Sequence, residues 1–294
     1  MSLPTYLTTA EAAEYLRLKE RKIYDLVSQG VIPCVRVTGK LLFPRQRLDL
    51  WLMNHLEGDD AVSSPTPPVL AGSQDPLLEW AVKESGAELA LLCQGSGDGV
   101  QRLIDGRAML AGMHIWHPEN QHYNDPATLG LSGMRDLVLM RWAKRQQGLL
   151  LAADNPHGLA RLEDIVRPGI RLAHRQPDAG VSHLLQGLLA RHRIDANALS
   201  WAAHPSLSED DLALAIRQGE ADVGVGIEAA AKRQGLAFIP LQQEHFDLAM
   251  RRRHYFEPAM QRLLAFAGSE RFAQRAEALG GYDISELGQV VYNA

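Results

Sequence analysis

Residues 61–68 read AVSSPTPP, and this segment constrains what the chain can fold into more than any other. Three prolines and two serines in eight residues resist packing into a helix or a strand, so the stretch predicts a semi-extended linker. It separates about 60 residues from about 225 in a chain of 294. We therefore expect a small domain over residues 1–60, the linker over 61–68 and a large domain over 69–294.

The composition is that of an ordinary soluble globular protein, with 46% hydrophobic and 22% charged residues. A formal net charge of -5 argues against a chain that binds nucleic acid along its whole length. No run of about 20 apolar residues occurs and the first residues do not form a secretory signal, so we expect a cytoplasmic protein with no membrane association. Cys34 and Cys93 lie far apart without metal or redox spacing, which favours a reducing compartment. We expect no cofactor and no metal.

Charge is distributed unevenly within the first 60 residues. Eight Lys and Arg balance eight Asp and Glu in this segment. All eight basic residues fall between Arg17 and Arg47, however, where Glu20 and Asp25 are the only acids, which leaves a local charge of +6. A small segment of this charge is typical of a nucleic-acid contact.

The first domain shows the order of elements of a winged helix-turn-helix. LTTAEAAEYL predicts a helix capped by Thr8 or Thr9, and KERKIYDLVSQG predicts a second helix that ends at Gly30. IPCVRVTGKLLFP predicts a hairpin that turns at Thr38-Gly39, the wing of such a domain. RQRLDLWLMNHL predicts a third helix, whose expected core residues are Leu48, Trp51, Leu52 and Leu56.

These stretches resemble the excisionase-type winged helix-turn-helix family, which is related to the MerR regulators. The resemblance covers residues 6–52 and implies that the second helix and the wing contact double-stranded DNA. Arg17-Leu18 departs from the family, which often has a small residue in the turn, and we expect this departure to shift the second helix slightly. The alternative is that the charges are only a solvated face. The residues expected to contact DNA are Lys19, Arg21, Lys22, Tyr24, Arg36 and Lys40.

In the large domain, apolar β-rich runs alternate with helical patterns. The runs include LVLMRW, GLLLAA, AFIPL and FDLAMRRR, each of which predicts a separate strand. Strand–helix alternation predicts a layered α/β fold with mainly parallel sheets, arranged as one domain or two lobes. The expected helices cover residues 76–85, 98–106, 180–192, 209–218, 228–234, 257–267 and 269–279.

Three junctions between a predicted strand and a predicted helix have similar residues. AGSQDPLLEWA, CQGSGDGVQRL and HRQPDAGVSHLLQGLLA each place small or hydroxyl residues where a helix begins. Helix N-termini expose free N–H groups and the positive end of the dipole, so three that converge would hold an anion or a polar ligand. Each junction alone is explained by capping, as with Asp75 before Pro76. The candidate ligand residues are Ser73, Ser96, Arg175, Gly180 and Ser182.

Two further residues join this candidate ligand set. In ADVGVGIEAAAKRQG, Gly224 and Gly226 allow close approach at a strand end, and Glu228 either interacts with a helix dipole or contacts the ligand. His114 in HIWHPENQHY is expected at a strand end near the cleft. A metal site formed by this stretch, with Glu119 as the carboxylate, is the less favoured alternative.

Four longer stretches resemble the periplasmic-binding-protein-like domain found fused to molybdopterin-biosynthesis proteins and to excisionase-type helix-turn-helix segments. They are GSQDPLLEWA, HRQPDAGVSHLL, the segment from GEADVGVGIE to HYFEP, and RAEALGGYDISELGQVVYN. The resemblance spans residues 70–293 and implies a type II fold with a ligand cleft between two lobes. Lobe one would hold residues 69–145 and 243–294, and lobe two residues 146–242. It also implies a link to molybdenum or tungsten metabolism.

This chain departs from the family at one loop, where the family often has Asn-Arg-Gln followed by a Gly-Ser-Gly-Thr-Arg type sequence. Here His174 precedes Arg175-Gln176, and the loop lacks a hydroxyl and a second arginine. Arg175 and backbone N–H groups would therefore carry most of the anion binding, which argues against a highly charged ligand.

The sequence thus predicts a homodimeric, ligand-responsive transcription regulator that is not an enzyme. The ligand would be a small polar or anionic compound, such as molybdate, tungstate or a compound related to the molybdenum cofactor. The alternative is an enzyme or ligand carrier of molybdenum-cofactor metabolism that uses the small domain for docking. No Gly-x-Ser-x-Gly elbow and no Walker-type loop occurs, so no motif calls for catalysis.

Overall fold

The computed structural model describes residues 5–53, 66–117, 122–177 and 179–294. The chain divides into two compact units, Met1–Ser64 and Pro65–Ala294. Most of the expected linker, residues 61–65, lies outside the described residues. Residues 66–68 are described and belong to the second unit. The Ala90 amide of that unit donates to the Pro68 carbonyl over 2.9 Å. None of the described helices is long and apolar enough to cross a membrane.

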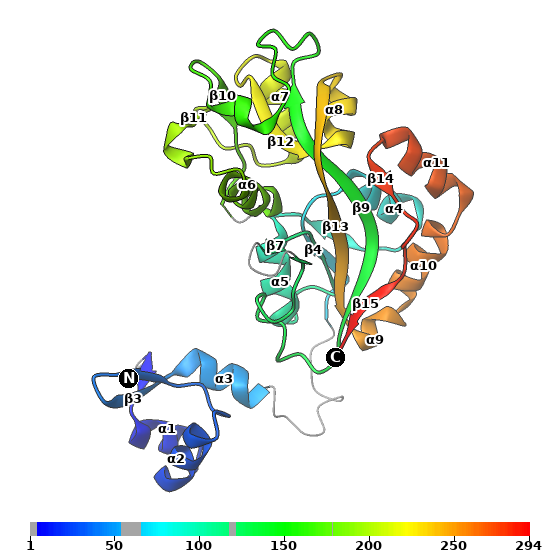
Figure 1. The fold of residues 1–294 in the computed structure, drawn as a ribbon. Helices are drawn as coiled ribbons and strands as arrows, with labels where there is room; N and C mark the ends of the chain where they lie inside the picture. Colours follow the sequence, from blue (N-terminus) through cyan, green and yellow to red (C-terminus); the bar gives the residue numbers. More distant parts are fainter. Residues whose placement is uncertain (1–4, 54–65, 118–121, 178) are drawn as a thin grey trace. The chain divides into compact units, whose positions relative to one another are not determined.

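The small unit consists of three helices and a three-stranded sheet (Figure 1). The sheet order is β1-β3-β2, with both pairs antiparallel. Leu7, Ile23, Phe43 and Leu48 are completely buried and form the core with Ala12. The elements are β1 (Tyr6–Leu7), α1 (Thr9–Tyr15), α2 (Glu20–Ser28), β2 (Val35–Val37), β3 (Lys40–Pro44) and α3 (Arg45–Met53).

Local chemistry explains where these elements begin and turn. Thr8 caps α1 in a capping box, in which its hydroxyl accepts from the Glu11 amide and the Glu11 carboxylate accepts from the Thr8 amide. Thr38 and Gly39 both have positive φ, 46° and 80°, as a two-residue hairpin turn requires. Arg17 also has positive φ, 53°, so the departure from the family in this turn falls on a left-handed residue.

The third helix packs differently from the prediction. Leu48 is buried and Trp51 is partly buried, as expected. Leu52 was expected in the core, but the prediction was wrong because 42% of its surface is exposed. Four residues at about 100° each place it about 40° around the helix from Leu48. Leu56 lies outside the described residues.

The large unit contains a mixed sheet with the order β11-β10-β12-β9-β13-β6-β4-β5. Its two ends are parallel, and its centre is antiparallel around β9, which also pairs with β14 and β15. The strands are β4 (Val69–Gly72), β5 (Ala90–Leu92), β6 (Leu110–Met113), β9 (Leu137–Leu151), β10 (Arg171–Ala173), β11 (Ser200–Trp201), β12 (Val223–Ile227), β13 (Ala237–Arg251), β14 (Tyr282–Asp283) and β15 (Val290–Asn293). A separate small hairpin pairs β7 (Trp116–His117) with β8 (His122–Tyr123).

Seven of the eight α-helices described in this unit begin and end within two residues of the predicted ranges, whereas α9 was not predicted and its first residues were assigned to the strand FDLAMRRR. Asp75 caps α4 by accepting from the Leu78 amide over 2.6 Å, with Pro76 in the first turn. The helices are α4 (Pro76–Glu84), α5 (Ser96–Ile104), α6 (Gly180–Arg191), α7 (Glu209–Arg217), α8 (Glu228–Gln234), α9 (Arg252–Tyr255), α10 (Pro258–Ala267) and α11 (Glu270–Leu279). Two short 3-10 helices cover Leu162–Val166 and Ala196–Ala198.

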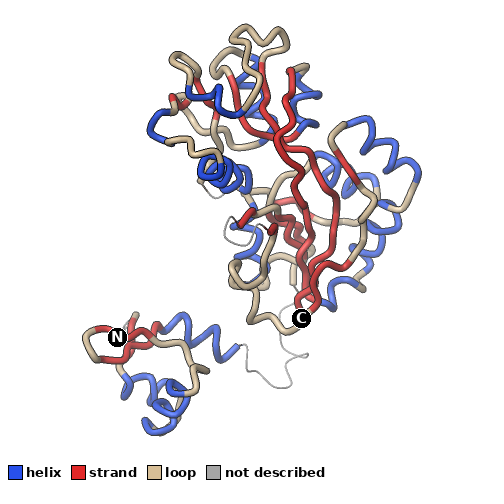
Figure 2. The backbone as a smooth tube through the Cα atoms, viewed as in Figure 1, coloured by secondary structure: helices blue, strands red, loops and turns tan. Residues whose placement is uncertain are grey.

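Strands β9 and β13 are the most extended elements, and each has 15 residues. They run side by side through the whole unit (Figures 1 and 2). Four strands were predicted here, but that prediction was wrong, because the polar segments between the apolar runs continue the pairing, as in Arg145 opposite Glu244. Both lobes therefore share these two strands. The lobe boundaries predicted near residues 145 and 243 fall in the middle of the two strands and remain a prediction.

Candidate functional site

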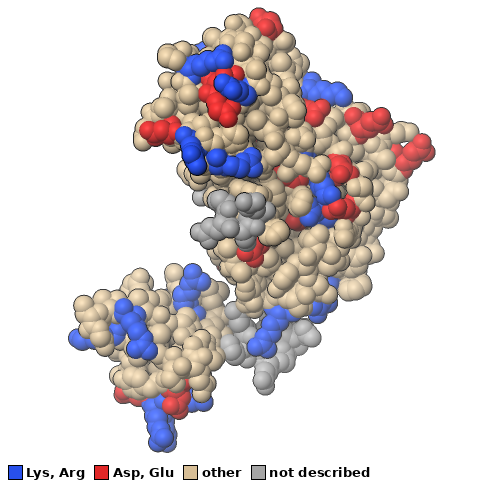
Figure 3. Space-filling model, viewed as in Figure 1, with Lys and Arg blue, Asp and Glu red and all other residues tan. Residues whose placement is uncertain are grey.

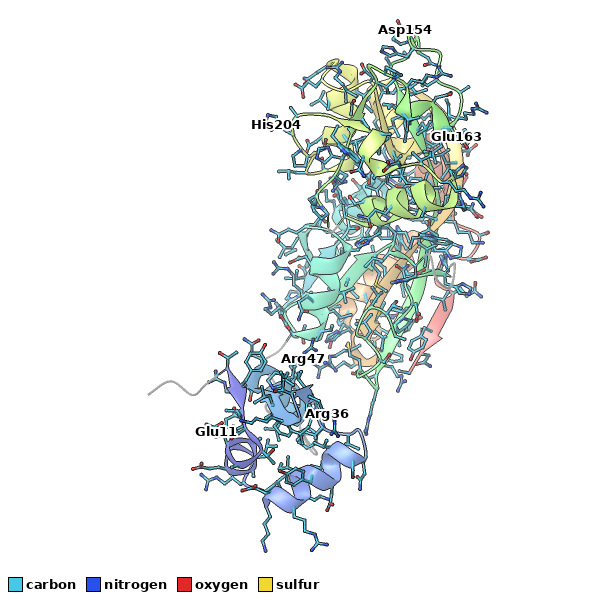
Figure 4. All side chains as sticks on the ribbon, turned by 60° about the vertical axis from the view of Figure 1, so that its left-hand side comes forward. Glu11, Arg36, Arg47, Asp154, Glu163 and His204 are labelled. Atoms are coloured by element: carbon cyan, nitrogen blue, oxygen red, sulfur yellow. The ribbon has the colours of Figure 1, made fainter. Side chains whose placement is uncertain are left out.

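The basic residues of the small unit lie on its surface. Lys19, Arg21 and Lys22 are exposed at the start of α2, and Tyr24 is 53% exposed on the same helix. Arg36 on β2 and Lys40 on β3 are exposed too. Among the described residues, none of these five cations forms an ion pair, so their donors are available to a partner. Figure 3 shows Lys and Arg side chains projecting from the small unit, and Figure 4 labels Arg36.

The second helix and the wing share one surface hollow. Tyr24 of α2, Lys40 of β3 and the first residues of α1 line a hollow of about 410 Å³. Tyr24 and Lys40 are therefore brought to the same surface by the fold. A lysine and a tyrosine hydroxyl on one surface offer donors that suit a phosphate group.

In the large unit, two of the predicted junctions meet. The Ser73 hydroxyl, after β4, lies 2.7 Å from the Ser96 hydroxyl at the start of α5. The His114 amide, after β6, donates to Ser96 Oγ over 3.2 Å. Ser73, Ser96 and His114 are 4%, 0% and 3% exposed, so they form a buried cluster at the ends of parallel strands. Ligands bind at such strand ends in open α/β sheets.

Three glycines allow the elements beneath this cluster to touch. Gly72 ends β4 with φ of 106°, and a Cβ on it would lie 2.2 Å from the Gly112 carbonyl oxygen of β6. A Cβ on Gly99 of α5 would lie 2.4 Å from the Gly72 Cα. Backbone therefore packs directly on backbone here, which fixes the positions of the two serines that flank the contact.

The N-terminus of α6 closes over the same cluster. A Cβ on Gly180 would lie 2.6 Å from His114 Cε1, so the first turn of α6 contacts the imidazole ring. Further along α6, a Cβ on Gly187 would lie 2.8 Å from Trp116 Cδ1. Helix α6 therefore packs against His114 and Trp116, beside the buried serines.

A buried ion cluster lies beside these residues and was missed by the sequence analysis. Arg145 of β9 is 1% exposed and donates to Glu244 Oε1 over 2.7 Å and to Asp75 Oδ2 over 3.0 Å. Glu244 of β13 also lies 2.8 Å from His114 Nδ1, and the Tyr282 hydroxyl donates to Asp75 over 2.6 Å. The signal that could have found the cluster is the charged segment KRQQ inside an otherwise apolar strand.

The cluster keeps the Glu244 carboxylate charged. Burial alone would raise the pKa of Glu244, but the Arg145 guanidinium and the His114 ring outweigh it and lower this pKa to about 2. Burial, together with the Asp75 carboxylate, raises the pKa of Tyr282, which therefore stays a hydrogen-bond donor. Glu244 thus brings negative charge next to His114, and Arg145 lies between Glu244 and Asp75 and bonds to both.

The other predicted ligand residues lie elsewhere. Arg175 donates to the carbonyls of Ser206 and Leu207, over 3.1 and 3.0 Å, and Ser182 donates to the Gln176 carbonyl over 2.9 Å. Both line a cavity whose lining residues all fall within residues 173–225. Ser73 and Ser96 do not line this cavity. Glu228 begins α8, where a Cβ on Gly281 would lie 2.7 Å from the Glu228 Cβ. The structure therefore brings together Ser73, Ser96, His114 and Gly180, but not Arg175, Ser182 or Glu228.

The histidines near His114 do not gather around a metal. His117 lies 3.0 Å from the Thr128 hydroxyl, while Glu119 lies outside the described residues. Within the described ranges, no group of three or more His, Cys, Asp or Glu side chains could hold a metal ion.

Two family models match the chain, one for each unit. A PBP superfamily domain matches residues 78–268, and a helix-turn-helix domain matches residues 6–55. The predicted fold class, an α/β protein with an N-terminal helix-turn-helix unit and a two-lobed domain of this type, is thereby confirmed. No finding supports the molybdopterin association.

Three proteins are similar to this chain over most of its length. The uncharacterized protein YvgK of Bacillus subtilis is 23% identical over 305 aligned residues, which cover 97% of each chain. A hydrogen-peroxide-bound cysteine-to-serine mutant of OxyR from Corynebacterium glutamicum has a TM-score of 0.51 and is 16% identical, with 92% of this chain and 89% of that chain covered. A phosphate-bound putative phosphate transporter substrate-binding protein from Clostridium perfringens has a TM-score of 0.53 and is 12% identical, with 75% and 98% covered. The two solved structures support the fold alone.

Proposed function

This chain belongs to the PBP superfamily, and because a helix-turn-helix domain precedes that domain, we propose that it is a ligand-responsive DNA-binding regulator of transcription. The observation that carries the proposal is the set of exposed cations at α2, β2 and β3 that pair with no acid in the described part of the chain, together with a larger unit that matches the PBP superfamily. A single small winged domain contacts few base pairs, so we also propose that a homodimer binds a repeated half-site.

Ligand binding would act through the contact between α6 and His114. A ligand that separates these elements, or that bridges them, would bind one arrangement of the lobes better than the other. The difference in affinity between the arrangements is the free energy available to change DNA binding. We propose that the ligand contacts the Ser73 and Ser96 hydroxyls and the amides at the starts of α5 and α6.

The charges around the site favour one class of ligand. Asp75 and Glu244 are both within hydrogen-bond distance of Arg145, so this guanidinium is already neutralised. A bare dianion would meet two carboxylates with little opposing charge. We therefore favour a small organic anion with its own donor groups, such as a compound related to the molybdenum cofactor, over molybdate or tungstate.

DNA binding should divide into specific and general contacts. We expect Arg21→Ala, on the exposed side of α2, to weaken operator binding by about 1–3 kcal/mol and to relax specificity. Lys40→Ala on the wing should weaken binding to all DNA sequences alike. It should also reduce the slope of log affinity against log salt concentration by about one. Electrophoretic mobility or anisotropy titrations against selected operator DNA, at several salt concentrations, measure both effects. Arg262→Ala, in the large unit, is the matched control. If the unaltered chain binds DNA with an affinity that depends on salt concentration but not on sequence, the regulator proposal is contradicted.

The ligand class is tested by titration calorimetry with molybdate, tungstate and sulfate. We expect no saturable heat from these dianions, and mass spectrometry of the purified chain should identify a retained organic anion. Ser96→Ala should lose that molecule because it removes a buried donor, whereas Ser85→Ala at the end of α4 should retain it. Micromolar molybdate binding that disappears in Ser96→Ala would show instead that the ligand is an inorganic oxyanion.

A further inference from the structure

One end of the sheet in the large unit carries a group of arginines outside the Ser73–Ser96 cluster. Arg251 at the end of β13 pairs with Leu137 at the start of β9, so the loop before β9 and helix α9 meet at this end. It is the lower end of the large unit in Figure 1, and Figure 3 shows Lys and Arg side chains on it. We call Arg135 and Arg251–Arg253 the basic edge.

Two of these four arginines are already engaged. Arg251 forms an ion pair with Asp136 at 3.0 Å. Arg252 donates to the side-chain oxygen of Asn293 over 2.9 Å and to the Ala294 carbonyl. The Arg252 amide also donates to the Asp136 carbonyl over 2.6 Å, which holds the loop before β9 against the start of α9.

The other two arginines keep their charge uncompensated. Arg135 and Arg253 are exposed, and neither pairs with an acid in the ranges that the structure describes. Arg253 donates to His254 Nε2 and to the Thr66 hydroxyl, each over 3.3 Å. Neither of these partners supplies a negative charge.

The His254 ring, which is buried beneath the basic edge, indicates the sign of the local field. Burial lowers the pKa of His254, and the Arg253 and Arg251 guanidiniums lower it further, whereas the Glu257 carboxylate raises it by less. The potential here is therefore positive. The rest of the large unit differs, because the first 60 residues are balanced in charge and the formal charge of -5 belongs to the remainder. An acidic body is repelled by DNA except where a positive surface faces the phosphates.

The chain enters the large unit at the basic edge. Thr66, which bonds to Arg253, lies just before β4. Residues 54–65 precede it and connect it to the small unit, and they span at most about 40 Å when fully extended. DNA bound by the small unit is therefore tethered near Thr66, which raises the effective concentration of phosphate groups at the basic edge.

From these observations we propose that the basic edge is a second DNA-contacting surface, on which the Arg135 and Arg253 guanidiniums bind phosphate groups of the duplex backbone. A guanidinium can pair with two oxygens of one phosphate. Arginines that project from separate elements suit an extended polyanion better than a small ion, which needs donors that converge. This surface adds to the DNA contact of the small unit, so the proposal rests on the proposed function.

Fluorescence anisotropy of the full chain with a long duplex that contains the selected operator, at several salt concentrations, tests this surface. Arg135→Gln/Arg253→Gln should weaken binding by about tenfold at low salt and reduce the slope of log affinity against log salt concentration by about two. An unrelated duplex should show the same losses, because phosphate contacts carry no sequence information.

Two controls separate the phosphate contact from other effects. Arg193→Gln/Arg217→Gln removes two exposed arginines that also pair with no described acid, but from α7 and the loop after α6, and it should leave the slope unchanged. Thr66→Val removes the neutral partner of Arg253 and should also bind DNA as the unaltered chain does. Thermal melting confirms that each variant is folded.

The outcomes distinguish this surface from the proposed function. If Arg21→Ala relaxes specificity but Arg135→Gln/Arg253→Gln has the slope of the unaltered chain, the basic edge is overturned and the regulator proposal stands. Equal losses in the Arg193→Gln/Arg217→Gln control, or in Thr66→Val, would also overturn it. If the unaltered chain binds without sequence preference and the slope still falls by about two, the regulator proposal fails and the basic edge stands. Absence of any DNA binding by the unaltered chain overturns both.

Discussion

Replacing Arg145 with alanine is expected to lower the free energy of unfolding by about 3–5 kcal/mol, the usual cost of breaking a buried ion pair from one side. The variant leaves Asp75 and Glu244, which are 1% and 0% exposed, without their shared cation. It also removes the guanidinium that lies 4.4 Å from the centroid of the Phe246 ring. Urea unfolding followed by circular dichroism measures the loss.

The matched control is Arg262→Ala, which breaks an ion pair with Glu88 at the surface. The two side chains of that pair are 50% and 83% exposed, so the expected loss is at most about 1 kcal/mol. Similar losses in the two variants would show that the buried cluster contributes nothing beyond an ordinary surface pair.

The pH dependence gives a second readout for the Arg145 variant. In the native chain the pKa of Glu244 is about 2, below its value of about 4.3 in an unfolded chain. This carboxylate therefore stabilises the fold above about pH 4.3, and its contribution is lost as pH falls through about 2. Without Arg145, burial raises the pKa of Glu244. The difference in free energy of unfolding between the unaltered chain and the variant should therefore shrink as pH is lowered from 7 toward 5. A deficit that is constant over this range would contradict the assignment.

Gly72→Ala should be nearly as damaging, with an expected loss of about 2–6 kcal/mol from backbone strain and overpacking together. The residue has φ of 106°, and its Cβ would lie 2.2 Å from a backbone oxygen that cannot rotate away. Gly86→Ala is the control, because its φ is also positive at 61° but nothing lies within 4 Å of the added atom. Chemical unfolding compares the two, and the control should lose only about 1–2 kcal/mol.

Gly72→Ala also affects the site. Any shift that relieves the overlap moves β4 against β6 or α5, and therefore moves Ser73 away from Ser96. We expect the retained ligand to be lost even where the variant is folded. A folded Gly72→Ala variant with unchanged stability and ligand retention would show that the contact between backbones does not position the serines.

Much of the local structure could be predicted from the sequence, because helix starts are determined by a few neighbouring residues. Thr8 with Glu11, and Asp75 with Pro76, form caps that depend on no distant partner. The turn at Thr38-Gly39 is likewise a local preference for positive φ. The meeting of Ser73 with Ser96 was predictable as well, since both follow parallel strands of one sheet.

The features that could not be predicted depend on distant pairing. The apolar runs LVLMRW and GLLLAA are separated by charged and amide residues that resemble a loop, yet Arg145 finds Glu244 and Asp75 far along the chain. Arg175 was predicted to bind the ligand from its position before α6, and this role stays a prediction; the partners of its donors, the carbonyls of Ser206 and Leu207, lie far along the chain. No local pattern encodes such partners.

The continuity of β9 and β13 has a consequence for how the large unit comes apart. Each strand contributes hydrogen bonds to both lobes, so neither lobe can lose its sheet without exposing edges in the other. Two lobes joined by loops could melt separately, whereas two lobes that share their central strands must melt together. We therefore expect the large unit to unfold in a single cooperative transition, and a destabilising substitution in either lobe to lower the melting temperature of both.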